Sequence, residues 1–170
     1  MSFSIAGKTA IVTGSSTGIG LAIGRQFVAA GANVMFADTN EAALVRELGE
    51  QADESNIRYF AGDLRERLTI ANLVSATIDA FDQVDILVNA ARQLVPTDVM
   101  NPEDTSVMTL LEQNLMTALQ LSQQVAKRMI KQAEGQEEGQ VGSIINLSSI
   151  AARQIQPELM GYSIAAAAVQ

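Results

Sequence analysis

Short apolar runs alternate along the chain with segments that have helical periodicity. The runs are rich in β-branched residues, and the segments between them repeat apolar residues at helical spacing. Strands are therefore predicted over 8–13, 33–37, 57–61, 84–89 and 142–147. Helices are predicted over 19–30, 41–53, 64–81 and 103–133, with a polar loop at 134–141 and a last helix opening at Pro157. Strands that are apolar on both faces and alternate with helices predict a parallel sheet covered on both sides.

We therefore expect an α/β fold in one domain over residues 1–170, a Rossmann-like doubly wound parallel sheet of at least five strands flanked by helices. Gly31 is expected to close the first helix, and Asn40 to cap the second. The fifth strand would be an apolar sheet edge, and the final helical pattern has no stop signal before Gln170. These features predict a truncated fold whose C-terminal part is absent, or a sheet completed by elements from elsewhere.

Composition narrows the chemistry that this domain can perform. The chain has 170 residues, which is enough for one core, and its net charge of −8 disfavours a nucleic-acid partner. It contains no Cys and no His, which excludes disulfides, thiolate nucleophiles, Ser-His-Asp triads and zinc held by His or Cys. No metal site is predicted, and proton transfer must use Asp, Glu, Lys, Tyr or Ser.

Targeting signals are not recognisable in the sequence. The first residues, MSFSIAGKTAIVTG, lack a basic region followed by an apolar stretch, and no apolar run reaches the roughly 20 residues that span a bilayer. We therefore expect a cytoplasmic protein with no membrane partner.

A glycine-rich turn joins the first strand to the first helix. The segment Thr13–Gly20 reads TGSSTGIG. Gly14 permits a tight turn, and Gly18 and Gly20 let the backbone approach a diphosphate while the helix packs on the strand. Free N–H groups at the helix start would face the phosphates. Hydroxyl donors could come from Ser15, Ser16 and Thr17. The alternative is an ordinary strand-to-helix turn.

Polar residues end the next three strands. Asp38 ends the second strand, where a carboxylate can accept both hydroxyls of an adenosine ribose and repels a 2′-phosphate; this favours NAD over NADP. Asp63, at the end of the third strand, could bind the adenine amino group or cap the helix that begins at Leu64. Asn89 ends the fourth strand and is expected to shape the same crevice. A turn or capping role is the alternative for Asp38.

The whole chain resembles the classical short-chain dehydrogenase/reductase family. The resemblance rests on TGSSTGIG, on DILVNAAR at Asp85–Arg92, and on GSIINLSS followed by Tyr162. It implies hydride transfer between a nicotinamide cofactor, NAD, and a carbonyl or secondary alcohol. The implied cofactor-binding residues are Gly14, Ser16, Thr17, Gly18, Ile19, Gly20, Asp38, Asp63, Leu64, Asn89, Ala90 and Ala91.

The same resemblance implies three catalytic residues. Tyr162 would be the general acid/base, Ser149 would bind and polarise the substrate oxygen, and Asn114 would hold a water in a proton relay. Each also has a structural alternative: a half-buried tyrosine, a serine cap at a strand end, and a satisfied polar residue on a helix.

The sequence departs from the family pattern at two positions. Ala166 stands where the motif Tyr-x-x-x-Lys has its lysine, and no basic residue follows Arg153. A phenol near pKa ~10 is about 0.1% ionised at pH 7, so losing a nearby cation should weaken alcohol oxidation most. Arg92 replaces the usual glycine, and it could clash with NAD, pair with its diphosphate or point toward the substrate.

Three functions therefore remain open at the sequence level. The first is an NAD-dependent oxidoreductase that acts on a carbonyl or secondary alcohol. The second is a non-catalytic NAD-binding or scaffolding protein of the same fold. The third is an S-adenosylmethionine-binding domain such as a methyltransferase, against which the Ser149 and Tyr162 pair argues.

The helix over 103–133 predicts a partner surface. One of its stripes, which includes Val125 and Met129, should cover the sheet. The other stripe would be exposed in a lone domain, and it contains Met108, Met116, Leu119 and Ile130. Family members commonly pair through this helix, so a homodimer or homotetramer is expected; the alternative is burial by further elements of the fold.

Overall fold

The computed structural model describes residues 4–49, 56–134 and 139–170. Its strands are β1 (Thr9–Thr13), β2 (Asn33–Asp38), β3 (Ile57–Ala61), β4 (Ile86–Asn89) and β5 (Ser143–Asn146). Its α-helices are α1 (Gly18–Ala29), α2 (Glu41–Leu48), α3 (Arg67–Phe81), α4 (Ser106–Leu110), α5 (Thr117–Gln132) and α6 (Met160–Val169). Residues 50–53 of the predicted second helix, and 135–138 of the predicted loop, lie outside the described residues.

The five strands form one parallel sheet in the order β3-β2-β1-β4-β5. The central strand β1 pairs with β2 on one side and β4 on the other, so that Ile11 lies between Met35 and Leu87. The connections that leave β1 and β3 therefore run to opposite sides of β1. This confirms the predicted doubly wound fold, whose binding crevice lies at the carboxyl ends of the strands where the order reverses.

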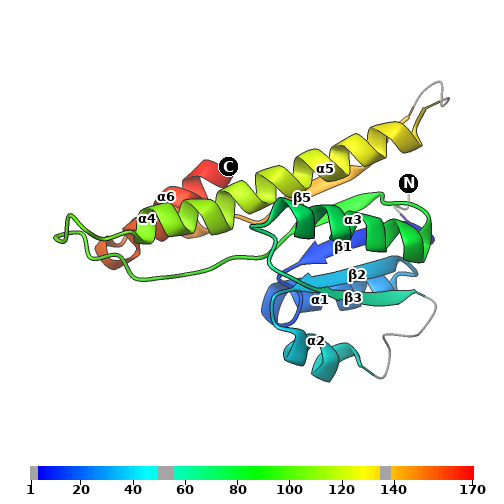
Figure 1. The fold of residues 1–170 in the computed structure, drawn as a ribbon, viewed down its shortest axis with the longest axis horizontal. Coiled ribbons are helices and arrows are strands. Elements are labelled where there is room, and N and C mark those ends of the chain that lie inside the picture. The colour runs from blue at the N-terminus through cyan, green and yellow to red at the C-terminus, as the bar shows by residue number, and fades with distance from the viewer. Residues whose placement is uncertain (1–3, 50–55, 135–138) are drawn as a thin grey trace.

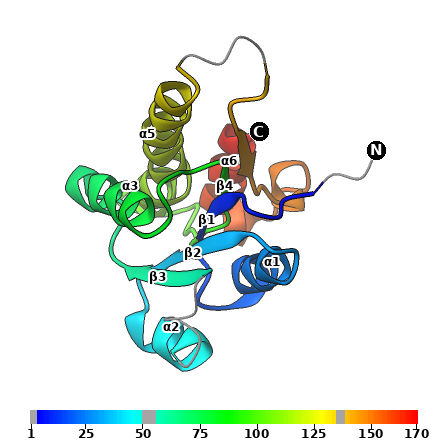
Figure 2. The same ribbon diagram turned by 90° about the vertical axis from the view of Figure 1, so that its right-hand side faces the viewer.

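Helices cover both faces of the sheet (Figure 2), and alternate residues of β1 belong to the clusters on the two faces. Ile11 packs in the cluster that α3 and α5 form over one face of the sheet, together with Leu73 and Leu121. Ala10 and Val12 pack on the other face, in the cluster that α1 and α2 cover. All five residues of β1 are buried, as expected for a strand with a helical layer on each side.

The predicted helix signals are confirmed at three places. The Asn40 side chain accepts a hydrogen bond from the Ala43 N–H at 3.0 Å and caps α2. Gly31 follows α1 with φ of +84°, a conformation in which glycine is favoured after a helix. Pro157 opens a 3₁₀ turn, Pro157–Leu159, that leads into α6. The helix predicted from Leu64, however, begins only at Arg67, because Asp63 organises a separate turn before it.

The long helix predicted over 103–133 is a composite of three segments. α4 passes into a π-helical turn, η1 (Leu111–Met116), which continues as α5. The predicted division into two stripes is confirmed: Val125 and Met129 are buried on the sheet. The other stripe is exposed, at Met108, Met116, Leu119 and Ile130.

The edge strand β5 pairs only with β4 among the described strands. Ile144 and Ile145 are 38% and 44% exposed, so the predicted apolar edge is confirmed. α6 lies beside α4 and η1 (Figure 1).

Two features are absent from residues 4–49, 56–134 and 139–170. No helix is both long enough and apolar enough to cross a bilayer. No group of three or more acidic side chains is arranged to hold a metal ion.

The packing predicts a matched pair of stability effects on α3. Leu73 is 0% exposed and Leu68 is 71% exposed. Leu73→Ala should lower the free energy of unfolding by about 2–5 kcal/mol, because it removes buried apolar atoms and leaves a cavity. Leu68→Ala should change it by less than about 0.5 kcal/mol. Urea unfolding of the two variants measures the difference, and equal effects would contradict the packing described here.

Candidate functional site

The glycine-rich turn is packed against the loop that follows β4. Gly14 has φ of +62°, and a Cβ there would lie 2.6 Å from the Ala91 Cα. A Cβ on Gly20 would overlap the Gly14 carbonyl oxygen. Because backbone occupies the place of both side chains, only glycine lets β1, the start of α1 and the β4 loop approach this closely.

The start of α1 is free to bind an anion. Gly18 has φ of +58°, and nothing lies within 4 Å of the position its Cβ would take. The N-cap residue Thr17 makes no side-chain capping bond, and the first turn contains no acidic residue. Uncapped N–H groups and the helix dipole therefore face open space. This space is a cleft of about 430 Å³, called the glycine cleft here, which is lined in part by Gly14, Ser16, Thr17, Gly18, Ile19, Gly20, Asp38, Ala90 and Arg92.

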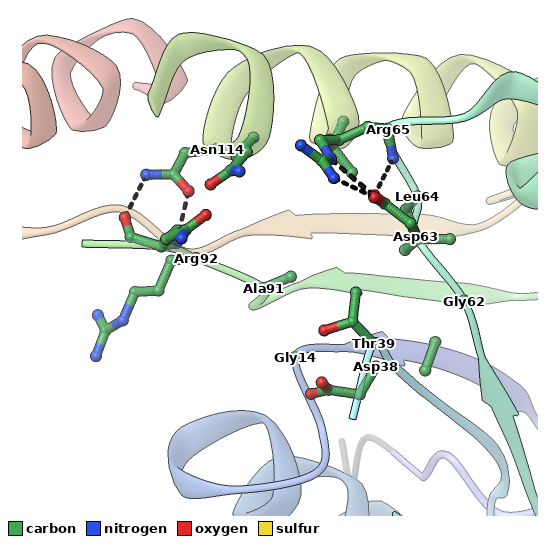
Figure 3. A pocket seen from close by; sticks show the side chains of 14 residues that line it. Gly14, Asp38, Thr39, Gly62, Asp63, Leu64, Arg65, Ala91, Arg92 and Asn114 are labelled. Carbon is green, nitrogen blue, oxygen red and sulfur yellow. Dashed lines mark hydrogen bonds and ion pairs between the residues drawn. The ribbon is translucent and has the colours of Figure 1, made fainter. Parts of the chain in front are cut away.

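A second cleft, of about 630 Å³, adjoins the first and also includes Gly14, Asp38 and Arg92 (Figure 3). We call it the acid cleft. The structure places further predicted site residues on its wall, namely Asp63, Leu64, Ala91 and Asn114. The two clefts together bring predicted residues from the ends of four strands to one edge of the sheet.

Asp38 is held at the boundary of the two clefts by backbone amides. Its Oδ2 accepts from the Ser16 N–H at 3.1 Å, and its Oδ1 accepts from the Asn40 N–H at 3.0 Å. The carboxylate thus ties the glycine-rich turn to the end of β2. The expectation that Ser15 could offer its hydroxyl to a ligand is wrong, because the side chain is buried and donates to the Ala37 carbonyl at 3.3 Å.

Asp63 is paired with Arg65 on the far wall of the acid cleft (Figure 3). Its Oδ1 accepts from the backbone N–H of Arg65 at 3.0 Å, and the Arg65 Nε lies 2.9 Å from Oδ2. The side-chain hydrogen bond from Arg65 lowers the pKa of Asp63, against a smaller opposing effect of burial. The same contact raises the pKa of Arg65. Sequence reasoning missed Arg65, since nothing in the pattern distinguishes it from any surface arginine.

The loop after β4 is fixed on both sides of Arg92. Thr13 Oγ1 accepts from the backbone N–H groups of Ala90 at 3.2 Å and Ala91 at 3.1 Å. On the other side, the Asn114 amide accepts from the Gln93 N–H at 2.7 Å and donates to the Gln93 carbonyl at 2.8 Å. Nothing in the sequence pattern indicates the Gln93 contact.

Asn114 belongs to the π-helical turn η1 and is 9% exposed. π-helical turns inside α-helices occur frequently at functional sites. Here the turn places the amide of Asn114 against the β4 loop, where it hydrogen-bonds the backbone N–H and carbonyl of Gln93. Its water-holding role stays a prediction.

Asn89 lies at the end of β4 and lines neither cleft. Its side-chain amide is buried and donates to Ser122 Oγ on α5 at 3.0 Å and to Asn146 Oδ1 on β5 at 2.8 Å. Asn89 therefore joins the end of the sheet to α5, and a direct contact with a cofactor stays a prediction.

Ser149 and Tyr162 lie outside the lining of both clefts. The Ser149 hydroxyl accepts from the Ala151 N–H at 3.2 Å and caps the 3₁₀ turn η2 (Ile150–Ala152). Tyr162 is 7% exposed on α6, in an apolar cluster with Leu110 and Ala165. Because η2 packs on α6, the fold brings the two segments together. Their catalytic roles stay predictions.

Comparisons with known proteins agree on one family. A family model described as short chain dehydrogenase matches residues 8–170. L-fucose dehydrogenase from Rattus norvegicus is 35% identical over 162 residues, or 92% of this chain and 54% of that protein. D-threitol dehydrogenase from Mycolicibacterium smegmatis is 34% identical over 155 residues, or 88% of this chain and 55% of that protein. The chain thus spans about half the length of these curated relatives.

Solved structures share the fold. A short chain dehydrogenase/reductase from Burkholderia phymatum in complex with NAD aligns with a TM-score of 0.87 at 24% identity, over 99% of this chain and 58% of that one. An apo SCOR enzyme from Clostridium thermocellum aligns with a TM-score of 0.82 at 27% identity, over 95% of this chain and 62% of that one.

The Asp63–Arg65 pair predicts a specific titration. Because its native pKa is lowered, Asp63 contributes stability above its unfolded-state pKa and loses that contribution as the pH falls through the native pKa. Arg65→Gln should move the Asp63 midpoint upward toward the ordinary carboxyl range, as followed by ¹³C NMR of the side-chain carboxyl. Arg25→Gln, which removes an exposed arginine paired with Glu47, should leave it in place. An Asp63 midpoint unmoved by Arg65→Gln would show that the pair does not set it.

Proposed function

Because the chain belongs to the short chain dehydrogenase family, we propose that it is an NAD-dependent oxidoreductase acting on a small carbonyl or secondary-alcohol substrate. The observation that carries the proposal is the convergence of three features on one sheet edge. These are the glycine turn, the uncapped start of α1, and the Asp38 carboxylate at the end of β2.

The residues present fit a nicotinamide dinucleotide. The N–H groups at the start of α1 and the open side of Gly18 suit a diphosphate. Asp38 would accept the hydroxyls of the adenosine ribose, and the wall around Leu64 would take the adenine. When bound, the nicotinamide supplies the hydride acceptor or donor.

The acid cleft favours NAD over NADP. A carboxylate at the position of Asp38 repels a 2′-phosphate, and the next residue, Thr39, offers no positive charge. Arg65 lines the same cleft, but its guanidinium is already paired with Asp63. The Asp38 carboxylate, with no cation directly after it in the chain, therefore supports NAD.

The proton chemistry is assigned to Tyr162. Its phenol would donate a proton to the substrate oxygen in reduction and accept one in oxidation, while the Ser149 hydroxyl would hydrogen-bond the same oxygen. Asn114 would act as a positioning residue, since its amide fixes the backbone of Gln93. This assignment rests on the family resemblance and on the packing of η2 against α6.

A non-catalytic NAD-binding protein is the second candidate, and one observation favours it. Ala166 is 7% exposed on α6, one helical turn after Tyr162, so a buried methyl group stands where the family motif has a cation. No Lys or Arg follows Arg153 in the sequence to replace it. Without a nearby cation a smaller fraction of a phenol is ionised at neutral pH, so less phenolate is available to accept a proton.

The names of the relatives support an alcohol or carbonyl substrate. Two are named for L-fucose and D-threitol, and another, 32% identical, is named 3beta-hydroxysteroid dehydrogenase 2, so their substrates differ in polarity.

The exposed stripe of Met108, Met116, Leu119 and Ile130 supports a homodimer or homotetramer through α4 and α5. Cytoplasmic localisation stays a prediction.

Tyr162→Phe tests the catalytic assignment. Turnover of ketones and secondary alcohols, L-fucose and D-threitol included, should fall by roughly 10²–10⁴-fold, because the acid/base group is lost. NADH affinity, measured by fluorescence titration, should stay within about twofold of the unmodified protein. Tyr59→Phe on β3, outside both clefts, is the matched control and should keep full activity. Unmodified protein that binds NADH but turns over no substrate would instead establish the non-catalytic candidate.

Ala166→Lys tests what the missing cation does. A lysine one turn after Tyr162 should favour the phenolate and raise alcohol oxidation by about tenfold or more at pH 7. Carbonyl reduction should gain less, because it uses the neutral phenol. Ala167→Lys adds the same charge at an exposed neighbouring position and should have little effect. Equal gains in the two variants would rule out an effect through Tyr162.

A further inference from the structure

We propose that Arg92 is a diphosphate-binding residue. It lies across the glycine cleft from the start of α1 and binds the diphosphate from the side opposite that helix. This inference rests on the proposed dinucleotide function, and it adds a contact from a position where the resembling family usually has glycine. Arg92 belongs to the lining of both clefts.

The backbone of Arg92 is fixed more firmly than its place in an exposed loop suggests. The residues before it are held by Thr13 Oγ1, which accepts from the N–H groups of Ala90 and Ala91. The residue after it, Gln93, is held by both polar atoms of the Asn114 amide. The base of the Arg92 side chain is therefore positioned by hydrogen bonds on both sides.

The guanidinium itself is free to bind a ligand. Within residues 4–49, 56–134 and 139–170 it has no hydrogen bond or ion pair, and the side chain is exposed. Figure 3 shows it pointing away from Asn114, on the side of the β4 loop on which the ribbon of α1 lies. Both oxygens of the nearby Asp38 accept backbone N–H groups instead.

Arg92 and α1 therefore present two positive features to one cleft. The start of α1 carries the positive end of the helix dipole, with no capping side chain and no acid in its first turn. A cation facing that end is unfavourable unless an anion lies between them. Gly18 leaves room on the helix side, because nothing lies within 4 Å of its missing Cβ.

The chemistry of the anion follows from this arrangement. A diphosphate has several oxygens. It can accept hydrogen bonds from the backbone N–H groups on one side and from the forked guanidinium donors on the other. The net charge of −8 repels a free anion at long range, and a local cation at the cleft offsets part of that repulsion.

Calorimetric titration with ADP and with adenosine tests the assignment, because the two probes share adenosine and differ in the diphosphate. Arg92→Gln should weaken ADP binding by roughly tenfold or more at low salt, through loss of a charge-assisted contact, and leave adenosine binding unchanged. The ADP affinity of Arg92→Lys should lie between those of the unmodified protein and Arg92→Gln, since a point charge replaces the forked guanidinium donors. The difference between the unmodified protein and Arg92→Gln should shrink as salt is added.

Arg153→Gln is the matched control, because it removes an exposed arginine that lies outside both clefts, and it should bind ADP like the unmodified protein. ADP affinity that is unchanged or higher in Arg92→Gln, or equal losses for ADP and adenosine, would overturn the role of Arg92 and leave the dinucleotide site standing. If the unmodified protein binds neither ADP nor NADH, the proposed function falls as well. Should Arg92→Gln fail to fold by circular dichroism, the ADP affinity of Arg92→Lys decides in its place, and a value equal to that of the unmodified protein at every salt concentration overturns the role.

Discussion

The close contact between the glycine turn and the β4 loop is the constraint on which the candidate site depends. Gly14 and Ala91 approach so closely that no side chain fits between them, and Thr13 secures the same loop through its hydroxyl. This contact joins the carboxyl ends of β1 and β4, while Asp38 joins the turn to β2. These contacts hold together the backbone segments that border the crevice at the switch in strand order.

Charge in this crevice is arranged so that negative groups are compensated and positive ones are left available. Asp63 is neutralised locally by Arg65, which also lowers its pKa, and Asp38 is stabilised by two backbone amides. The start of α1 has no capping side chain, and the Arg92 guanidinium has no ion pair among the described residues. In an acidic protein such local donors can still favour an anion, because they act at short range while the net charge acts diffusely.

The segment that carries Tyr162 is organised separately from the sheet. Thr97 Oγ1 accepts from the Gly161 N–H at 2.9 Å and from the Ser106 hydroxyl at 2.8 Å, which ties the start of α6 to α4. Asp104 supports the same turn; its pKa is lowered by the Ser106 side chain and by backbone N–H groups. The π-helical turn that contains Asn114 connects this region to the β4 loop, because its amide binds Gln93.

The sequence alone determined the fold class, the strand alternation and most helix signals, because periodicity, caps and glycine positions act locally. Gly31, Asn40 and Pro157 could be interpreted from their own neighbours. The tertiary structure decided what depends on distant partners: the amide of Asn89 turns to Ser122 and Asn146, and that of Asn114 to Gln93. The hydroxyl of Ser15 likewise donates a hydrogen bond to the Ala37 carbonyl of β2. A polar side chain has several possible hydrogen-bond partners, and only the packed fold determines which of them lies within reach.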